Sequence, residues 1–326
     1  MKFNEDSRVK IPALLHLCRL GYKYISLNNA IWDPETNIFT EVFKQSIVRI
    51  NPDFDPLQAE RLLVVTSLVL SNEDLGIGFF EKLTSESGVK LIDFENFENN
   101  TFNVVTELTY KNGDEEFRPD IILLINGMPL AFVEVKKPNN RDGIIAERER
   151  INKRFQNKKF RKFVNITQLM VFSNNMEYDN EDIEPLQGAF YASPSYTKPI
   201  FNYFREEEKL DLEKLLAEDD DSLENFVLKD NNMAVIKHSP EFLTNKNPNT
   251  PTNRVLTSLF SKNRLSFILR YAIAYVDEKK GVEKHVMRYP QIFATKAIEN
   301  KLESGIKKGI IWHTQGSGKT ALAFYN

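Results

Sequence analysis

The segment from residue 102 to residue 136 constrains the fold more than any other part of the chain. It contains three runs rich in β-branched and large apolar residues, at Phe102–Tyr110, Asp120–Ile125 and Leu130–Lys136. The runs are separated by KNGDEE and by INGMP, which are typical of tight turns between antiparallel strands. The segment therefore predicts a three-stranded meander.

Helices and further strands are expected around this meander, because the spacing of apolar residues changes along the chain. The pattern predicts helices over Ser7–Leu20, from Asp55–Pro56 to Leu68, over Arg141–Val164 and over Leu256–Tyr275; strands at Tyr22–Leu27, Gln168–Ser173 and Gly188–Ala192; a loop-rich stretch from the second helix to about residue 100; and charged helical residues at 205–224. Together these elements predict an α/β fold in which helices flank a mixed sheet.

A change in composition divides the chain into two unequal parts. Residues 238–253 are rich in Pro, Asn and Thr, which is typical of a linker. We expect residues 1–235 to fold as one unit, residues 236–255 to form an exposed connection, and residues 256–326 to begin a second domain. At roughly 150 residues per domain, the length of 326 residues fits two domains.

The charge and cysteine content exclude several classes of protein. The chain carries 43 Lys and Arg residues against 46 Asp and Glu residues, and a net charge of −3 argues against a wholly basic nucleic-acid-binding protein. The single cysteine, Cys18, cannot form an internal disulfide, and no apolar run approaches the ~18 residues of a membrane span. We therefore expect a soluble cytoplasmic protein with no membrane partner.

An acid and a lysine lie on one face of the last strand of the meander. Glu134 and Lys136 are two residues apart, so both side chains leave that strand on the face shared by Leu130 and Phe132. Asp120 opens the preceding strand. Two carboxylates can hold a hard cation such as Mg²⁺, and a nearby lysine can offset charge that develops on a phosphoryl group. We interpret Asp120, Glu134 and Lys136 as catalytic residues, with Asp120 and Glu134 as metal ligands.

The register of the hairpin decides whether the two carboxylates meet, because residues directly opposite each other share a face. With a two-residue loop at Asn126–Gly127, Asp120 would face Val133 and Glu134 would point away. We therefore predict either a three-residue loop around Gly127 or a β-bulge. The alternative is a surface strand with an ordinary Glu–Lys pair, which the apolar character of the preceding strand argues against.

The sequence HTQGSGKT at residues 313–320 ends as a phosphate-binding loop does. Glycines let backbone N–H groups cradle phosphate oxygens, while the Lys would reach nucleotide phosphates and the Thr would bind Mg²⁺. His313 stands where kinase-like loops have Gly, so the sequence is closer to motif I of superfamily 2 helicases. Ile310–Trp312 is the expected preceding strand, and RYPQ at 288–291 stands where such helicases carry an adenine-binding glutamine. The candidate nucleotide-binding residues are Gln291, Gly316, Ser317, Gly318, Lys319 and Thr320.

The two constellations together resemble a known family. Pro119-Asp120 with Glu134-Val135-Lys136 resembles the PD-(D/E)xK nucleases, and this site followed by WHTQGSGKT resembles the restriction (R) subunit of type I restriction–modification enzymes. The resemblance implies a restriction-endonuclease-like, Mg²⁺-dependent nuclease domain and the first elements of a RecA-like helicase lobe, cut off after motif I. It implies ATP-driven translocation and cleavage of double-stranded DNA together with modification (methyltransferase) and specificity subunits.

Three features of the family are missing from this sequence or are not assigned to a residue. The chain itself is not expected to hydrolyse ATP, because the family's acidic motif and second lobe would follow residue 326. The family's Gln-x-x-x-Tyr motif is not matched, since Phe155 could replace Tyr but Ile151 stands in place of Gln. The superfamily often uses an acid from the first helix, and the candidates that the sequence does not separate are Glu5, Asp6 and Glu60.

Two other functions stay open. One is a helicase-linked nuclease that acts alone in repair, and the other is an inactive nuclease-like module that binds DNA or a partner. Eight Lys and Arg residues lie between positions 148 and 162, where Glu149 is the only acid. They could contact DNA phosphates, or they could form a solvated helix face.

Overall fold

A mixed sheet forms the centre of the protein, as the sequence predicts. The computed structural model describes residues 5–138, 143–178, 187–279, 281–312, 318 and 322. The seven strands lie in the order β1 (Lys23–Tyr24), β2 (Phe102–Thr106), β5 (Ile121–Ile125), β6 (Met128–Val135), β7 (Leu169–Ser173), β8 (Ala189–Ala192) and β9 (Asn202–Tyr203). β1 is parallel to β2 and β6 is parallel to β7, while the other neighbours are antiparallel.

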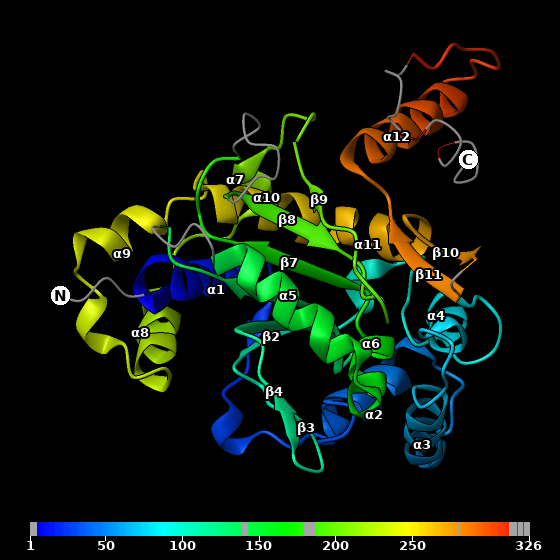
Figure 1. Cartoon of the computed structure of the whole chain (residues 1–326), viewed down its shortest axis with the longest axis horizontal. Coiled ribbons are helices and arrows are strands. Elements are labelled where there is room, and N and C mark those ends of the chain that lie inside the picture. Colours follow the sequence, from blue (N-terminus) through cyan, green and yellow to red (C-terminus); the bar gives the residue numbers. More distant parts are fainter. Residues whose placement is uncertain are drawn as a thin grey trace.

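Helices surround this sheet, and two small hairpins lie outside it (Figure 1). The described helices are a π-helical turn (Asp6–Lys10), α1 (Ile11–Arg19), α2 (Thr40–Ile50), α3 (Ala59–Val69), α4 (Ile77–Thr84), α5 (Gly143–Gln156), α6 (Arg161–Ile166), α7 (Leu212–Leu215), α8 (Asp221–Asp230), α9 (Pro240–Asn245), α10 (Pro251–Phe260), α11 (Lys262–Tyr271) and α12 (Tyr289–Glu303). The hairpins are β3 (Tyr110–Asn112) with β4 (Glu115–Phe117), and β10 (Ile273–Glu278) with β11 (Gly281–Val286).

Each face of the sheet has its own hydrophobic cluster. Ile122 and Phe132 point to the face that α5 and α6 cover, where both helices bury apolar side chains. Leu123 and Val133 point to the other face, where they join a cluster that includes α1, α10 and α11. In Figure 1, α5 crosses in front of the sheet, with α10 behind it. Successive residues of β5 and β6 point to opposite faces of the sheet, and both faces are buried. This explains why these strands are almost wholly apolar.

Most of the expected elements are confirmed. The strands expected at 102–110, 120–125, 130–136, 168–173 and 188–192 correspond to β2, β5, β6, β7 and β8, and the β3–β4 hairpin lies between the first two. The expected short strand at residues 22–27 is reduced to β1. The helix expected from Asp55 is confirmed: the Asp55 carboxylate accepts the Leu57 N–H at the start of a 3₁₀ turn that leads into α3.

Other helical expectations need correction. The helix expected over 141–164 is interrupted by a 3₁₀ turn between α5 and α6, and the helix expected over 256–275 is replaced by α10, α11 and the start of β10. Only α7 and the start of α8 are helical within 205–224. The helices α2 and α4 were not predicted from the sequence. α4 forms within the supposed loop because the Asp74 carboxylate accepts the N–H groups of Gly76 and Gly78 at its start.

The segment 236–255, expected to be a linker, is packed against the core. It contains α9 and the first half of α10, and the Phe242 side chain is fully buried. Leu256 of α10 belongs to the same hydrophobic cluster as Leu14 of α1. The expectation that 238–253 is exposed is therefore wrong, whereas the position of a domain boundary here stays a prediction. Among the described residues, no helix is both long and apolar enough to cross a membrane.

Candidate active site

The β5–β6 hairpin turns through only two residues. Asn126 and Gly127 have φ angles of 50° and 77°, the left-handed values that a type I′ turn requires. Gly127 lies so close to α2 that a Cβ atom there would be 2.7 Å from the Phe39 carbonyl oxygen, so only glycine fits. A two-residue turn alone would place Asp120 and Glu134 on opposite faces of the sheet.

A β-bulge corrects this register. The pairing of β5 with β6 shifts by one residue beyond Leu124, and Leu130 is the extra residue in β6. Asp120 therefore comes opposite Glu134, and the predicted β-bulge is confirmed. The bulge also turns Leu130 to the opposite face, so the expectation that Leu130 shares the face of Glu134 is wrong, while Phe132 does share it.

The two carboxylates lie next to each other at the open end of this hairpin. Asp120 Oδ2 accepts the Val135 backbone N–H at 2.9 Å, which fixes it against β6. Glu134 is buried, and its Oε1 has no hydrogen-bond partner among the described residues. Burial, followed by the nearby charges of Asp120 and Glu147, raises the pKa of Glu134 well above its ordinary value. A bound cation would favour the charged form of Glu134 and so oppose this shift.

This donor set fits a magnesium ion held by two carboxylates. Mg²⁺ is typically bound by one or two protein carboxylates, with water and substrate phosphates as the other ligands. A cation between Asp120 and Glu134 would supply the partner that Glu134 Oε1 lacks. No group of three or more His, Cys, Asp and Glu side chains within the described ranges is arranged to hold a metal ion.

Lys136 lies beside the carboxylates on the same face. Its Nζ is 3.7 Å from Glu134 Oε2 and 3.5 Å from Glu147 Oε2, and it donates to the Val135 carbonyl at 2.9 Å. Burial lowers the pKa of Lys136, but the charges of Glu134, Asp120 and Glu147 outweigh burial and raise it above its ordinary value. Lys136 is therefore a fixed cation at neutral pH.

α5 contributes an acid that the sequence analysis missed. Glu147 lies on the buried stripe of α5, between Ile144 and Ile151, and its side chain is 2% exposed. Phe155, considered there as a substitute for the missing Tyr, is fully buried in the core with Ile151 and does not reach the site. An acid within an apolar helical stripe was the signal in the sequence that could have identified Glu147.

The structure separates the three acids that the sequence left as candidates. Glu5 lies close enough to Lys136 and Asp120 for their charges to act on it, and it accepts the Lys137 backbone N–H. Burial, in the first place, raises the pKa of Glu5 above its ordinary value. Glu60 instead forms an exposed ion pair with the side chain of another helix, α2.

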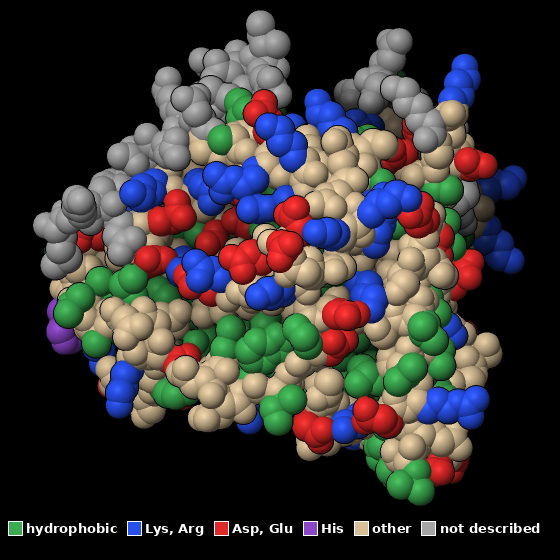
Figure 2. Space-filling model, turned by 60° about the horizontal axis from the view of Figure 1, so that its bottom comes forward, with side chains coloured by type: hydrophobic (Ala, Val, Ile, Leu, Met, Phe, Trp, Pro, Cys, Tyr) green, Lys and Arg blue, Asp and Glu red, His purple; other side chains and the backbone are tan. Residues whose placement is uncertain are grey.

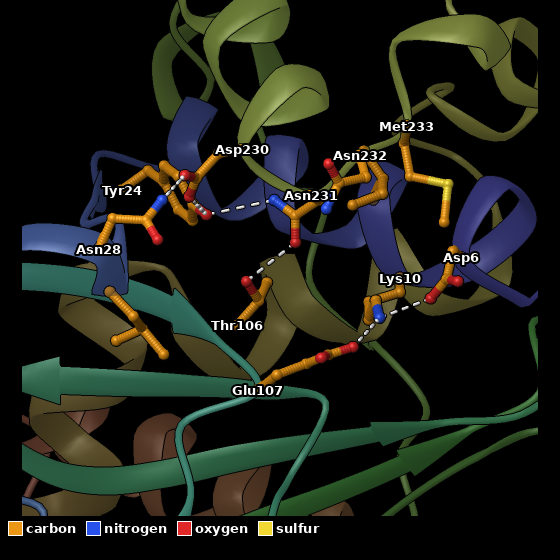
Figure 3. Close-up of a pocket in the computed structure, with 12 residues that line it drawn as sticks. Asp6, Lys10, Tyr24, Asn28, Thr106, Glu107, Asp230, Asn231, Asn232 and Met233 are labelled. Atoms are coloured by element: carbon orange, nitrogen blue, oxygen red, sulfur yellow. Dashed lines mark hydrogen bonds and ion pairs between the residues drawn. The ribbon is translucent and has the colours of Figure 1, made fainter.

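Asp6 does not belong to the site either, because its side chain pairs with Lys10 in a neighbouring polar cleft. Figure 3 shows Lys10 between Asp6 and Glu107, with Nζ–oxygen distances of 2.5 and 2.6 Å. Tyr24 and Asp230 also line this cleft of about 280 Å³, and the Tyr24 hydroxyl donates to Asp230. Its polar groups thus satisfy one another, which leaves Glu5 as the first-helix acid nearest the carboxylate pair.

The basic residues at positions 148–162 do not form one positive face. Lys158 and Lys162 pair with acids of other segments, Glu73 and Glu35. Arg161 lies over the Tyr196 ring, with 3.6 Å between the guanidinium carbon and the ring centroid. Figure 2 shows basic and acidic side chains interspersed over one face of the molecule. The basic run is therefore partly neutralised by acids of other segments, and its cations are divided among separate partners.

The RYPQ motif lies against Gly318 of the candidate phosphate loop. Gln291, in the first turn of α12, accepts the Arg288 backbone N–H at 2.8 Å and donates to the Gly318 carbonyl at 3.2 Å. Gly318 has φ 84°, and a Cβ atom there would be 2.5 Å from Gln291 Nε2. A cavity of about 820 Å³ opens beside these residues and is also lined by Tyr275 and Lys284.

The other candidate nucleotide-binding residues, Gly316, Ser317, Lys319 and Thr320, lie outside the described residues. The strand expected at Ile310–Trp312 is not formed, and Ile310 and Trp312 are 92% and 91% exposed. An isolated strand of this kind needs neighbouring strands to be stable.

Two known families match this chain. The family described as Type I restriction enzyme R protein N terminus (HSDR_N) matches residues 2–179, which include the whole β5–β6 hairpin and α5. This match covers more than half of the chain. The chain belongs to the HSDR_N family. The SWI2/SNF2 ATPase family matches residues 290–326, which contain the phosphate-loop sequence that follows the nuclease-like sheet.

Relatives of this HSDR_N chain come from Methanocaldococcus jannaschii. The protein named as the type I restriction enzyme MjaIXP endonuclease subunit is 27% identical over 360 aligned positions, which cover 99% of this chain and 31% of the relative. The protein named as the MjaVIIP endonuclease subunit is 27% identical over 77% of this chain and 20% of its own length. The HSDR_N chain thus spans about a third or less of these relatives.

Proposed function

We propose that this chain is the nuclease portion of a type I restriction enzyme R subunit, which cleaves duplex DNA with Mg²⁺ and begins an ATP-driven translocase. The observation that carries this proposal is the paired Asp120 and Glu134 carboxylates, with charged Lys136 on the same face. The bulge that brings the carboxylates together, and the unpartnered Glu134 Oε1, both support a metal site rather than a structural ion pair.

Each residue has a distinct part in this proposal. Asp120 and Glu134 would hold Mg²⁺, which supplies an activated water and neutralises phosphoryl charge. Lys136 would place its ammonium group beside the oxygens of the scissile phosphate and stabilise the charge that develops there. Glu5 would orient water or the end of β6 through its contact with the Lys137 backbone.

The segment around α12 would bind the nucleotide. Gln291 would contact adenine in the cavity beside Gly318, while Gly316, Ser317, Lys319 and Thr320 would bind the phosphates and a second Mg²⁺ of the ATP. Because the chain spans about a third or less of its relatives, ATP hydrolysis and DNA translocation are proposed for the full-length protein.

The proposed partners are double-stranded DNA and separate modification (methyltransferase) and specificity subunits, in the cytoplasm. The relatives' names favour this assignment over a nuclease that acts alone in repair. Asp120 is held in place by a backbone hydrogen bond, and Lys136 is held beside it by an ion pair with Glu147. This fixed arrangement of an acid and a lysine favours a nuclease over an inactive binding module.

The test is a plasmid-cleavage assay with the full-length protein. With modification and specificity subunits, ATP and Mg²⁺, we expect the protein to cut unmodified plasmid and to spare plasmid methylated by the same subunits. A repair nuclease would cut without those subunits and regardless of methylation. An inactive module would bind plasmid DNA and leave it intact under every condition.

A further inference from the structure

A buried acid lies on the sheet-facing side of α5. Glu147 shares that side with Ile144 and Ile151, and its side chain is 2% exposed. A carboxylate in such a position destabilises the fold unless cations and hydrogen bonds compensate for its lost hydration. Its neighbours must therefore be part of any account of why an acid stands there.

Three cations from two elements surround this one carboxylate. Arg150, one turn along α5, donates to Glu147 Oε2 at 2.9 Å. Arg154, a further turn along, has its Nη1 3.6 Å from Glu147 Oε1. Lys136 reaches Oε2 from the end of β6, at 3.5 Å. Glu147 thus ties two positions of α5 to the catalytic lysine.

The two arginines differ from the rest of the basic run. Other cations of the run form ion pairs with acids outside the site, as Lys158 does with Glu73. Arg154 is also held from the side, because its guanidinium carbon lies 4.3 Å from the centroid of the Phe117 ring. The Arg150 side chain is 58% exposed, and one contact to Glu147 occupies only part of the five N–H donors of a guanidinium.

The local charge favours an anionic ligand. Lys136 is also paired with Glu134, so Arg150 and Arg154 are the cations that share the single negative charge of Glu147. This sharing leaves a positive excess on α5, beside the carboxylate pair. An arginine with free donors is well suited to bind phosphate oxygens, because its planar fork can make two parallel hydrogen bonds. The positive excess lies on the side of the carboxylate pair that α5 covers.

We propose that Glu147 is a positioning residue that holds Lys136, Arg150 and Arg154 as a binding site for backbone phosphates of the DNA strand that is cut. The proposal rests on the nuclease function proposed above and adds the residues that grip the substrate. Glu147 itself does not touch DNA. It fixes the direction of the three cations, much as an anchored counter-ion fixes a catalytic side chain.

Two variants and a matched control test this proposal in the full-length protein. Glu147→Gln keeps the size of the side chain but releases the cations, so DNA cleavage with the partner subunits should slow by about a hundredfold. Duplex-DNA affinity, measured in Ca²⁺, should equal or exceed that of the wild type, because a negative charge is lost. Cleavage and affinity therefore move apart, whereas a purely structural defect would lower both.

Arg150→Ala should weaken DNA binding and reduce the slope of log affinity against log salt by about 0.9, the value for one lost phosphate contact. Its exposed side chain makes a folding defect a poor explanation for such a change. Lys158→Ala removes an equal charge from the same basic run, but its partner is Glu73, so cleavage should stay within about twofold of wild type.

The proposal is overturned if Glu147→Gln cleaves DNA at the wild-type rate, if it loses affinity and cleavage together, or if Arg150→Ala leaves the salt slope unchanged. These outcomes are distinct from a failure of the proposed function. If Lys136→Ala also cleaves normally, the nuclease assignment fails. If Lys136→Ala is inactive while the Glu147 and Arg150 variants are normal, only the positioning role fails.

Discussion

Lys136→Ala is expected to abolish DNA cleavage by the full-length protein and to leave DNA-stimulated ATP hydrolysis nearly intact. The carboxylates around Lys136 keep it charged, and that charge would act only on the phosphate being cut. Loss of a preorganised group of this kind typically costs about 10²–10³-fold in rate. The proposed nucleotide-binding segment begins 152 positions later, at Arg288, so ATP hydrolysis should be unaffected.

The measurement is a paired ATPase and plasmid-cleavage assay with modification and specificity subunits present. Lys137→Ala is the matched control, because it removes the neighbouring charge but keeps the backbone N–H that Glu5 accepts. We expect this control to cleave at close to the wild-type rate. Wild-type cleavage by Lys136→Ala would show that the nuclease assignment is wrong.

The second large effect is expected from Lys319→Ala, which should stop both ATP hydrolysis and DNA cleavage. Lys319 follows Gly318, and the Gly318 carbonyl is already held by Gln291. A lysine at this position of a phosphate loop neutralises charge on the nucleotide phosphates, so its loss should lower ATP turnover by orders of magnitude. Cleavage should stop as well if translocation must precede cutting.

The same paired assay measures both activities of this variant. Lys308→Ala, an exposed lysine just before the loop, provides a control of equal charge. Substantial ATP hydrolysis by Lys319→Ala would rule out the phosphate-loop assignment. Loss of ATP hydrolysis with normal cleavage would instead show that cutting does not depend on translocation.

The centre of the nuclease-like fold was predictable because its sequence signals are local. Turn residues separate β5 from β6, and the spacing of Asp120 and Glu134 required either a longer loop or a bulge. The choice between these two depended on a tertiary contact, since Gly127 is pressed against α2, a helix that the sequence analysis missed. The bulge then corrects the register without lengthening the turn.

The misleading segment was 238–253, where composition and structure disagree. Pro240 and Pro251 each begin a helix, at the position where a missing backbone N–H does no harm, and the Ser239 hydroxyl caps α9. Pro, Ser, Thr and Asn are frequent both in linkers and at helix starts, so composition alone does not distinguish these two structures.

The other residues of the site could be identified only from distances in the folded protein, which no sequence pattern shows. Glu5 and Asp6 are adjacent in sequence, yet Asp6 pairs with Lys10 while Glu5 approaches Lys136. Glu147 approaches Lys136 only because α5 packs with that face toward β6. Such assignments require the three-dimensional arrangement, since neighbours in the chain have different partners in space.

The central claim is that Asp120 and Glu134 hold a divalent cation. Because Glu134 must lose its proton to bind metal, Mg²⁺ affinity should rise with pH, by up to about tenfold per unit below its raised pKa. The pKa of Glu134 is higher in the folded than in the unfolded protein. Without metal, the free energy of unfolding should therefore fall as the pH rises from the ordinary pKa of Glu to the raised one. Bound Mg²⁺ should restore this lost stability.

The most direct measurement is calorimetric Mg²⁺ titration of the full-length protein without nucleotide, at several pH values from about 4.5, the ordinary pKa of a Glu side chain, upward. Glu134→Gln is compared with Glu149→Gln, which alters an exposed acid of α5. We predict pH-dependent binding by the wild type and by Glu149→Gln, and none at this site by Glu134→Gln. Equal Mg²⁺ affinity and equal pH dependence in all three proteins would contradict the metal site.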